Sequence, residues 1–456
     1  MSRHKVAATA TATLALAVAI LPPPASGATP AHVQPPLLTL ADAQRIALAN
    51  HPDIKADTFD RLAASEAVAI ARAGYAPQVE GSAVQALAPG GTRIAAYNAL
   101  TDPTVIQRSA VGVGISQYVT DFGRTAALIR ASRLDLEAQA AASSATRDTI
   151  LLNVTEAYFE VLRADALLDV ASATLRERNT LLHQVRALQR AGLRSTLDVA
   201  ISERDTSSAD QLVLQSRNER MNAYAALAEA LGTSAFRIYR LQEAGSLPPL
   251  PPTLDALLAT ALHNNPELAQ ADAQGAAASA RAGAAARLNA PTVEGYGFFG
   301  AAPFKESNTA IPSPYAAGGV ALNIPLYTGG ELAAERRQAQ DYAAAAAERA
   351  LEERNTMLRD VRTAFENVRT ADGNIVVTDQ LLRTAREAFE LTQARYRIGL
   401  SSIVDLSEAQ LSEEQAAIAR TNATYDFIIQ EKSLEFAAGV IAAGNFTEAP
   451  PPAPDD

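Results

Sequence analysis

The sequence contains no cysteine. This absence excludes disulfides, thiolate metal sites, cysteine nucleophiles and lipid attachment through an N-terminal cysteine. Tryptophan is also absent, and aromatic residues make up only 5% of a chain that is 48% hydrophobic. A composition so poor in large side chains and so rich in alanine favours closely packed helices over a thick globular core.

Positive charge and histidine are scarce as well. The 456-residue chain has a formal net charge of −11, which argues against nucleic-acid binding because that function needs a basic face. Its five histidines form no metal-ligand cluster. The Asp-Phe-Gly sequence at 121–123 lacks the other kinase motifs, so it is interpreted as a strand-to-helix turn. We therefore expect no enzyme, and no catalytic, cofactor-binding or metal-binding residues.

Long apolar runs are missing from most of the chain, so no transmembrane helix is expected after the N-terminus. At the N-terminus, basic residues up to Lys5 precede an apolar run and then small residues up to Gly27. This order is typical of a secretory signal, which we predict over 1–27, followed by a proline-rich extension over 28–37. The alternative is a membrane anchor, but the run is short for a span.

The rest of the chain reads as one unit written twice, over 38–246 and 247–440, before a disordered tail at 441–456. The opening of the first unit, LTLADAQRIALANHPDI, is echoed in the second by PTLDALLATALHNNPEL. Each copy predicts a short helix that ends before Pro52 or Pro266, because proline disfavours helical geometry in its predecessor. A second helix is expected to start at that proline.

Segments with a period of two follow in each copy. They predict strands at about 78–88 and 108–120 in the first copy, and at about 292–302 and 315–327 in the second. In the first copy, for example, Val111, Val113 and Ile115 alternate with small residues. Strands of about 9–11 residues with aromatic ends suit an outer-membrane barrel. A soluble hairpin packed on helices is the alternative for these segments.

Very long helical patterns come next, with almost no proline or glycine. The first runs from about 124 to 191, which corresponds to roughly 100 Å of helix. Apolar residues recur with the four-then-three spacing of a coiled-coil seam in both copies. They are Val154, Tyr158 and Val161 in the first copy, and Val361, Phe365 and Val368 in the second.

Each long helix ends in the same turn, QRAGLRSTLDVAISE from Gln189 and YRIGLSSIVDLSEAQ from Tyr396. A glycine suits the end of one helix, a serine suits the start of the next, and an aspartate completes an S-x-x-D capping pattern. These residues are Gly192, Ser195 and Asp198 in the first copy, and Gly399, Ser402 and Asp405 in the second. The pattern predicts tight helical hairpins with tips at 191–198 and 398–405.

The two aspartates have two interpretations. Helix capping alone accounts for both of them. Alternatively, both aspartates lie at the same tip, and Glu408 lies one turn beyond Asp405. In a symmetric oligomer these carboxylates would form rings of negative charge, which are a device for cation selectivity and gating.

The signal, the two copies, two strands per copy and hairpins ending in G-L-x-S-x-x-D closely resemble the outer membrane efflux protein family, the TolC-like channel-tunnels. The resemblance covers residues 39–439. It implies a mainly α homotrimer with a membrane β-barrel. Long antiparallel coiled-coil hairpins would form an α-barrel, and four strands per chain would contribute to an outer-membrane barrel of about 12 strands. Four strands cannot close a barrel alone, and open edges are not tolerated in lipid.

The resemblance also implies a function. The chain would be the outer membrane channel of a multicomponent efflux or type I secretion system, located in the Gram-negative outer membrane and extending into the periplasm. Its partners would be a periplasmic adaptor (membrane fusion) protein and, through it, an inner-membrane pump of RND or ABC type. The alternative is a periplasmic structural coiled coil or adaptor without a pore. The sequence does not distinguish drugs, metal ions and polypeptides as cargo.

The site residues implied by the resemblance lie at the hairpin tips. The periplasmic entrance, or gate, is expected at Asp198, Asp405, Glu408 and Tyr396. Some family members place a basic residue, which can tie the entrance shut, where this chain has Ser401; Arg194 and Arg397 are the candidates to substitute for it. The residues expected to contact the adaptor are Gly192, Leu193, Arg194, Ser195, Gly399, Leu400, Ser401 and Ser402.

Overall fold

The computed structural model describes residues 35–87, 107–243, 253–301 and 315–442, together with 245, 247 and 249. The expected signal (1–27), most of the expected extension (28–37) and the expected tail from 443 onward lie outside the described residues. The chain divides into two units, Met1–Pro36 and Leu37–Asp456. All described helices and strands belong to the second unit.

The helices form two series of four with similar lengths. The first series is α1 (Leu40–Asn50), α2 (Pro52–Ala73), α3 (Arg124–Arg190) and α4 (Thr196–Ala230). The second is α5 (Leu254–Asn264), α6 (Pro266–Ala285), α7 (Glu331–Arg397) and α8 (Ile403–Ala437). Helices α3 and α7 have 67 residues each, and α4 and α8 have 35 each. The predicted breaks before Pro52 and Pro266 are confirmed.

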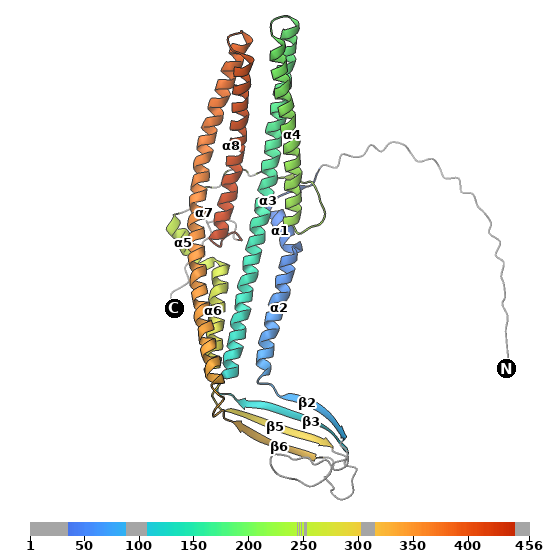
Figure 1. The fold of residues 1–456 in the computed structure, drawn as a ribbon, viewed down its shortest axis with the longest axis vertical. Helices are drawn as coiled ribbons and strands as arrows, with labels where there is room; N and C mark the ends of the chain where they lie inside the picture. The colour runs from blue at the N-terminus through green and yellow to red at the C-terminus, as the bar shows by residue number, and fades with distance from the viewer. Residues whose placement is uncertain are drawn as a thin grey trace, which may run out of the picture. The chain divides into compact units, whose positions relative to one another are not determined.

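The long helices pair as two antiparallel hairpins (Figure 1). Hairpin 1 consists of α3 and α4, and hairpin 2 consists of α7 and α8. Their turns lie at the same end, opposite the sheet (Figure 1). Helix α6 packs against both α3 and α7, α2 packs against α3, and α8 packs against α3 and α4. In the part of the chain that the structure describes, no helix is long and apolar enough to cross a membrane.

The predicted coiled-coil seams form the buried core. Val154, Tyr158 and Val161 are buried in the first series, in a cluster that includes Tyr224 and Leu227 of α4. The Tyr158 hydroxyl lies 3.0 Å from the Leu38 carbonyl oxygen and 2.9 Å from the Gln242 nitrogen. It thereby fastens two short parallel strands, β1 (Leu37–Leu38) and β4 (Arg240–Leu241), to α3.

In the second series the seam is buried in the same way. Val361 and Val368 are fully buried and Phe365 is partly buried. They pack in a cluster with Phe427 and Leu434 of α8.

Two close backbone contacts fix the far ends of α4 and α8. Gly232 follows α4 with a φ of +67°, and a Cβ added there would lie 2.7 Å from the His51 Cα. Gly439 follows α8 with a φ of +70°, and its Cβ would lie 2.9 Å from the Asn264 carbonyl carbon. Only glycine fits positions that combine a left-handed backbone with such an approach. The two glycines therefore anchor each returning helix on the α1–α2 corner or the α5–α6 corner.

The four longer strands form one antiparallel sheet in the order β2-β3-β5-β6 (Figure 1). They are β2 (Gln78–Leu87), β3 (Gln107–Thr120), β5 (Thr292–Ala301) and β6 (Tyr315–Asn323). The outer strands, β2 and β6, each pair on one side only within the described residues. This sheet therefore has two unpaired edges.

The strand register places apolar side chains on one face of the sheet. Val79 pairs with Ile115, and Val113 pairs with Phe299. Because alternate residues share a face, these side chains lie on the same side. The other face carries polar and small residues together with the exposed aromatic side chains of Tyr118, Tyr296 and Phe298. The apolar face includes Val79, Val111, Val113, Ile115, Phe299, Val320 and Leu322, all of them exposed in this chain.

The expected strand at 315–327 is too long at its C-terminal end. β6 stops at Asn323, which pairs with Thr292, the first residue of β5. No residue of β5 remains to pair beyond that point, and Pro325 has no N–H to donate to a ladder. The last residue of β6 is therefore the one that pairs with the first residue of β5.

The Asp-Phe-Gly sequence is a strand-to-helix turn, as predicted. The Asp121 carboxylate accepts from the backbone nitrogens of Gly123 (3.1 Å) and Thr125 (2.6 Å). Phe122 and Gly123 adopt positive φ values of 53° and 91°. The turn leads from β3 directly into α3 and so sets the start of hairpin 1.

Candidate functional site at the hairpin tips

The turn of hairpin 1 satisfies its own backbone. Gly192 has a φ of +74°, and the Leu193 nitrogen donates to the Leu188 carbonyl at 2.9 Å, as in a Schellman motif. The Asp198 nitrogen donates to the Ser195 hydroxyl (3.2 Å), and the Ser195 nitrogen donates to the Asp198 carboxylate (3.0 Å). The predicted capping box is therefore present.

The turn of hairpin 2 is built in the same way. Gly399 has a φ of +79°, and the Asp405 nitrogen donates to the Ser402 hydroxyl at 3.1 Å. The Asp405 carboxylate accepts from the Ser402 nitrogen (2.8 Å) and the Ser401 hydroxyl (3.0 Å). These donors, the Ser402 backbone first, lower the pKa of Asp405 below its ordinary value. The carboxylate is therefore ionised at neutral pH.

Arg194 joins the two tips. Its Nη2 donates to the Tyr396 carbonyl oxygen at 2.6 Å, and its guanidinium carbon lies 4.2 Å from the centre of the Tyr396 ring. The other candidate, Arg397, donates to Gln393 of its own helix. The basic side chain that bridges the tips therefore comes from hairpin 1.

Tyr396 is buried beside the tip, with only 3% of its surface exposed. Burial raises its pKa, the nearby Asp198 carboxylate adds to this, and Arg194 opposes it. Its hydroxyl oxygen is buried and has no hydrogen-bond partner among the described residues. The ring packs in an apolar cluster of both hairpins, formed with Leu181, Val185, Phe389, Ile403 and Leu406.

The expected entrance residues are thus only partly brought together. Arg194 and Tyr396 are in contact, whereas Asp198 and Asp405 are each held by their own capping box and Glu408 is exposed one turn further along α8. The sequence interpretation missed part of the tip surface. Large apolar side chains are exposed there at Leu197, Ile398 and Val404, beside the expected Leu193 and Leu400. The sequence did carry a signal for this surface: the three apolar residues stand at the tight turns, where the pattern offers no apolar side chains to cover them.

No group of three or more histidine, aspartate or glutamate side chains is arranged to hold a metal ion within the described parts of the chain.

Comparison with known proteins identifies the family. The sequence profile described as "Outer membrane efflux protein" matches residues 44–233 and 257–440, which make up well over half of the chain. This protein belongs to the outer membrane efflux protein family. The expected family is therefore confirmed.

Relatives and solved structures agree with this assignment. The outer membrane protein TolC of Vibrio cholerae is 27% identical over 424 residues, covering 88% of this chain and 91% of the relative. The solved structure of CusC has a TM-score of 0.77 at 20% identity, covering 88% of this chain and 92% of that one. The solved structure of VceC from Vibrio cholerae has a TM-score of 0.74 at 20% identity and covers 88% and 96%.

The outer membrane efflux protein described here is a mainly helical outer membrane channel protein of an efflux system. It is located in the outer membrane and extends into the periplasm. The pore-less coiled-coil alternative is not favoured. The relatives are channel proteins, not enzymes.

Proposed function

We propose that this efflux protein is one subunit of a passive homotrimeric conduit that spans the outer membrane and the periplasm. The observation that carries the proposal is the four-stranded sheet, which combines two unpaired edges with one exposed apolar face. In lipid, every backbone N–H and C=O needs a partner within the protein. The edges of β2 and β6 therefore require strands from other copies of the chain.

The number of strands supports a trimer. The smallest bacterial barrels have about 8 strands, so one four-stranded sheet cannot close, and three copies would provide about 12. The apolar face would then meet lipid, and the other face, with its polar and small residues and the aromatic side chains of Tyr296 and Phe298, would line the lumen. The equal lengths of α3 and α7, and of α4 and α8, support a duplication of the unit. We assign its two copies to 38–246 and 247–440, after a signal at 1–27.

We assign the periplasmic entrance to the hairpin tips. Arg194 would hold the entrance closed through Tyr396, in the role that a basic residue at the position of Ser401 has in some family members. In a trimer the ionised Asp405 and the exposed Glu408 would each occur three times around the opening, and would favour cations there. Asp198 would serve mainly as a cap and as a neighbour of Tyr396.

The exposed tips are the proposed contact with a periplasmic adaptor (membrane fusion) protein. Leu193 and Leu400 are exposed beside serine hydroxyls, which suits a mixed apolar and polar docking surface. An inner-membrane pump of RND or ABC type would act through the adaptor. The conduit itself would perform no chemistry, so the pump would select the cargo. Type I secretion is an additional candidate role.

Conductance across a planar lipid bilayer tests this proposal. The purified mature chain should form trimers in detergent and give discrete, long-lived steps with a preference for cations. A silent bilayer with both the wild-type chain and a variant lacking the Arg194 side chain, despite confirmed trimers, would refute the conduit. A monomer in detergent would refute the pooled sheet.

A further inference from the structure

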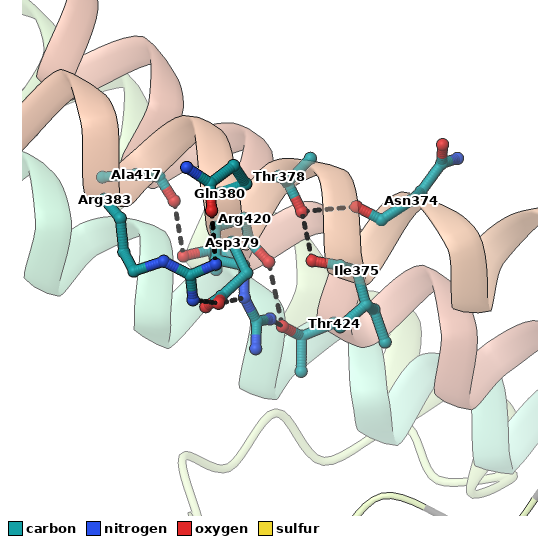
Figure 2. Close-up of polar contacts among 10 residues, drawn as sticks. Asn374, Ile375, Thr378, Asp379, Gln380, Arg383, Ala417, Arg420 and Thr424 are labelled. Carbon is teal, nitrogen blue, oxygen red and sulfur yellow. Dashed lines mark hydrogen bonds and ion pairs between the residues drawn. The ribbon is translucent and has the colours of Figure 1, made fainter.

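Hairpin 2 is held together by ion pairs of its own (Figure 2). Asp379 of α7 lies between Arg383 of the same helix and Arg420 of α8, and Arg420 in turn donates to Thr424. The Arg420 Nε lies 3.4 Å from the Asp379 carboxylate. This link joins α7 to α8 in addition to the apolar seam.

The same kind of link occurs nearer the tips in both hairpins. Arg186 of α3 pairs with Glu203 of α4 at 2.7 Å, and Arg386 of α7 pairs with Glu413 of α8 at 3.3 Å. Each pair joins the two helices of one hairpin. The two hairpins are therefore suited to move as separate stiff rods.

A buried arginine joins the two rods below the tips. Arg178 of α3 is only 6% exposed, and its Nη1 donates to the Gln410 side-chain oxygen of α8 at 2.5 Å. Carboxylate oxygens of Asp205 (α4) and Glu414 (α8) each lie 3.7 Å from its guanidinium. Asp205 also accepts from the Ser407 hydroxyl of α8 at 2.6 Å. We call Arg178, Asp205, Gln410 and Glu414 the Arg178 clamp.

The clamp lies at a different level from the tip contact. At 1.5 Å per residue, Arg178 is roughly 20 Å from Gly192 along α3. The apolar cluster of Leu181, Phe389 and Leu406 fills the space between the clamp and the Arg194–Tyr396 contact. Apolar contacts are non-directional and tolerate small sliding, whereas a buried, hydrogen-bonded charge requires one geometry.

The clamp connects three of the four long helices. It holds α8 against α3 and α4, and α8 is also the helix of hairpin 2 that packs against hairpin 1. The tip contact, in contrast, holds α7 through Tyr396. Loss of the tip contact would therefore leave hairpin 2 attached to hairpin 1 at the clamp, and the tip of hairpin 2 could swing away as one rod.

We infer that the Arg178 clamp is the pivot about which the two hairpin tips separate when the entrance opens. The inference rests on the proposed function, because it assigns a pivot to that entrance. Arg178 is a positioning residue: it touches no cargo and determines where the movement starts. A rotation of about 15° around a point roughly 20 Å away displaces a tip by about 5 Å.

Distances within one chain test the inference. Because the chain has no cysteine, pairs of spin labels can be attached at introduced cysteines without a background signal. One pair, Leu193→Cys with Ile398→Cys, reports on the tips, and another, Leu214→Cys with Val377→Cys, reports on the region below the clamp; all four positions are exposed. Labelled chains are diluted with unlabelled ones so that only distances within a chain are read.

The first arm leaves the clamp intact and removes the tip contact with Arg194→Ala. We expect the tip pair to move apart by about 5 Å and the lower pair to keep its distance. An equal increase in both pairs would overturn the inference, because the hairpins would then part along their whole length. This arm needs no clamp variant, so it is decisive even if clamp variants fold poorly.

The second arm adds a neutral clamp: Arg178→Met, Asp205→Asn and Glu414→Gln. Changing all three avoids leaving buried carboxylates without their cation. The distance distribution of the lower label pair should then also broaden and shift to longer distances. An unchanged lower distance, with helical content retained, would show that the clamp does not hold the hairpins.

The matched control neutralises another α3–α8 ion pair, Arg163 with Asp426 at 2.7 Å, further from the tips. Arg163→Met with Asp426→Asn and Glu160→Gln, combined with Arg194→Ala, should give the distances of Arg194→Ala alone. The same broadening as in the neutral clamp would overturn the placement at Arg178. These distances are read in detergent and need no pore, so failure of the conduit in a bilayer is a separate result.

Discussion

The close approach of Gly232 to the α1–α2 corner gives a sharp test of how hairpin 1 is anchored. In Gly232→Ala the new methyl group would lie 2.7 Å from the His51 Cα and 2.9 Å from the His51 nitrogen, both of them backbone atoms. The left-handed φ of +67° is unfavourable for alanine in addition. The end of α4 therefore has to move away from the corner.

The magnitude follows from two separable contributions. A left-handed backbone costs a residue other than glycine about 1–2 kcal/mol. Overpacking against backbone atoms adds about 1–3 kcal/mol. Gly192 is the matched control, since it has a similar φ of +74° but nothing within 4 Å of the added Cβ. We expect Gly192→Ala to cost only the first contribution.

The assay is thermal unfolding of both variants in detergent, followed by circular dichroism at the helical band. The effect of alanine on the unfolded chain is similar at both positions, so it cancels in the comparison. Gly232→Ala should lower Tm several degrees more than Gly192→Ala does. Equal losses would refute the reasoning, because they would show that the contact with His51 adds nothing to the backbone strain. In hairpin 2 the same comparison can be made between Gly439→Ala, which meets backbone atoms, and Gly399→Ala, which does not.

Three further predictions concern charge. Burial raises the pKa of Asp148 from 3.8 to about 6. The folded state is therefore not destabilised by this carboxyl below about pH 4, where it is protonated, and it loses stability as the pH rises through 6. Asp148→Asn should raise the free energy of unfolding at pH 7.5 by up to roughly 3 kcal/mol and flatten the dependence of Tm on pH between 5 and 7.5. An unchanged pH dependence would contradict this. Arg194→Ala removes a cation–π contact and a hydrogen bond worth about 1–2 kcal/mol and should increase the open fraction in bilayer recordings. Arg397→Ala should not, since the hydrogen bond of Arg397 among the described residues goes to Gln393 of its own helix. Glu408→Gln should reduce the cation-to-anion permeability ratio at unchanged Tm because Glu408 is not a cap, and an unaltered ratio would speak against a charge ring.

Local signals in the sequence were sufficient for the turns. Gly192 with Ser195, and Gly399 with Ser402, satisfy backbone groups within a few residues, so their pattern could be interpreted without knowing the fold. The helix breaks before Pro52 and Pro266 are local in the same sense. These predictions depend on the geometry of one turn, which the sequence specifies directly.

Contacts between distant segments were not accessible in that way. Gly232 has to be glycine because the His51 backbone lies against it. The sequence around neither residue indicates that the two are in contact. Arg178 has the pattern of an ordinary charged helix residue, and only the packing of α8 against α3 and α4 buries it. The end of β6 depends on where β5 begins. Each of these features is a property of a pair of segments, which a single segment does not encode.

The self-sufficient turns also limit the free energy that opening requires. Because each capping box satisfies its own turn, the tips can separate without exposing unpaired backbone groups. The contacts that are lost are the Arg194–Tyr396 pair and part of the apolar cluster around Leu181. The Tyr396 hydroxyl, which has no hydrogen-bond partner among the described residues, would gain water when the tips separate, and this offsets some of the cost. Each turn keeps its own hydrogen bonds while the contact between the two turns breaks. This is the arrangement that a reversible entrance needs.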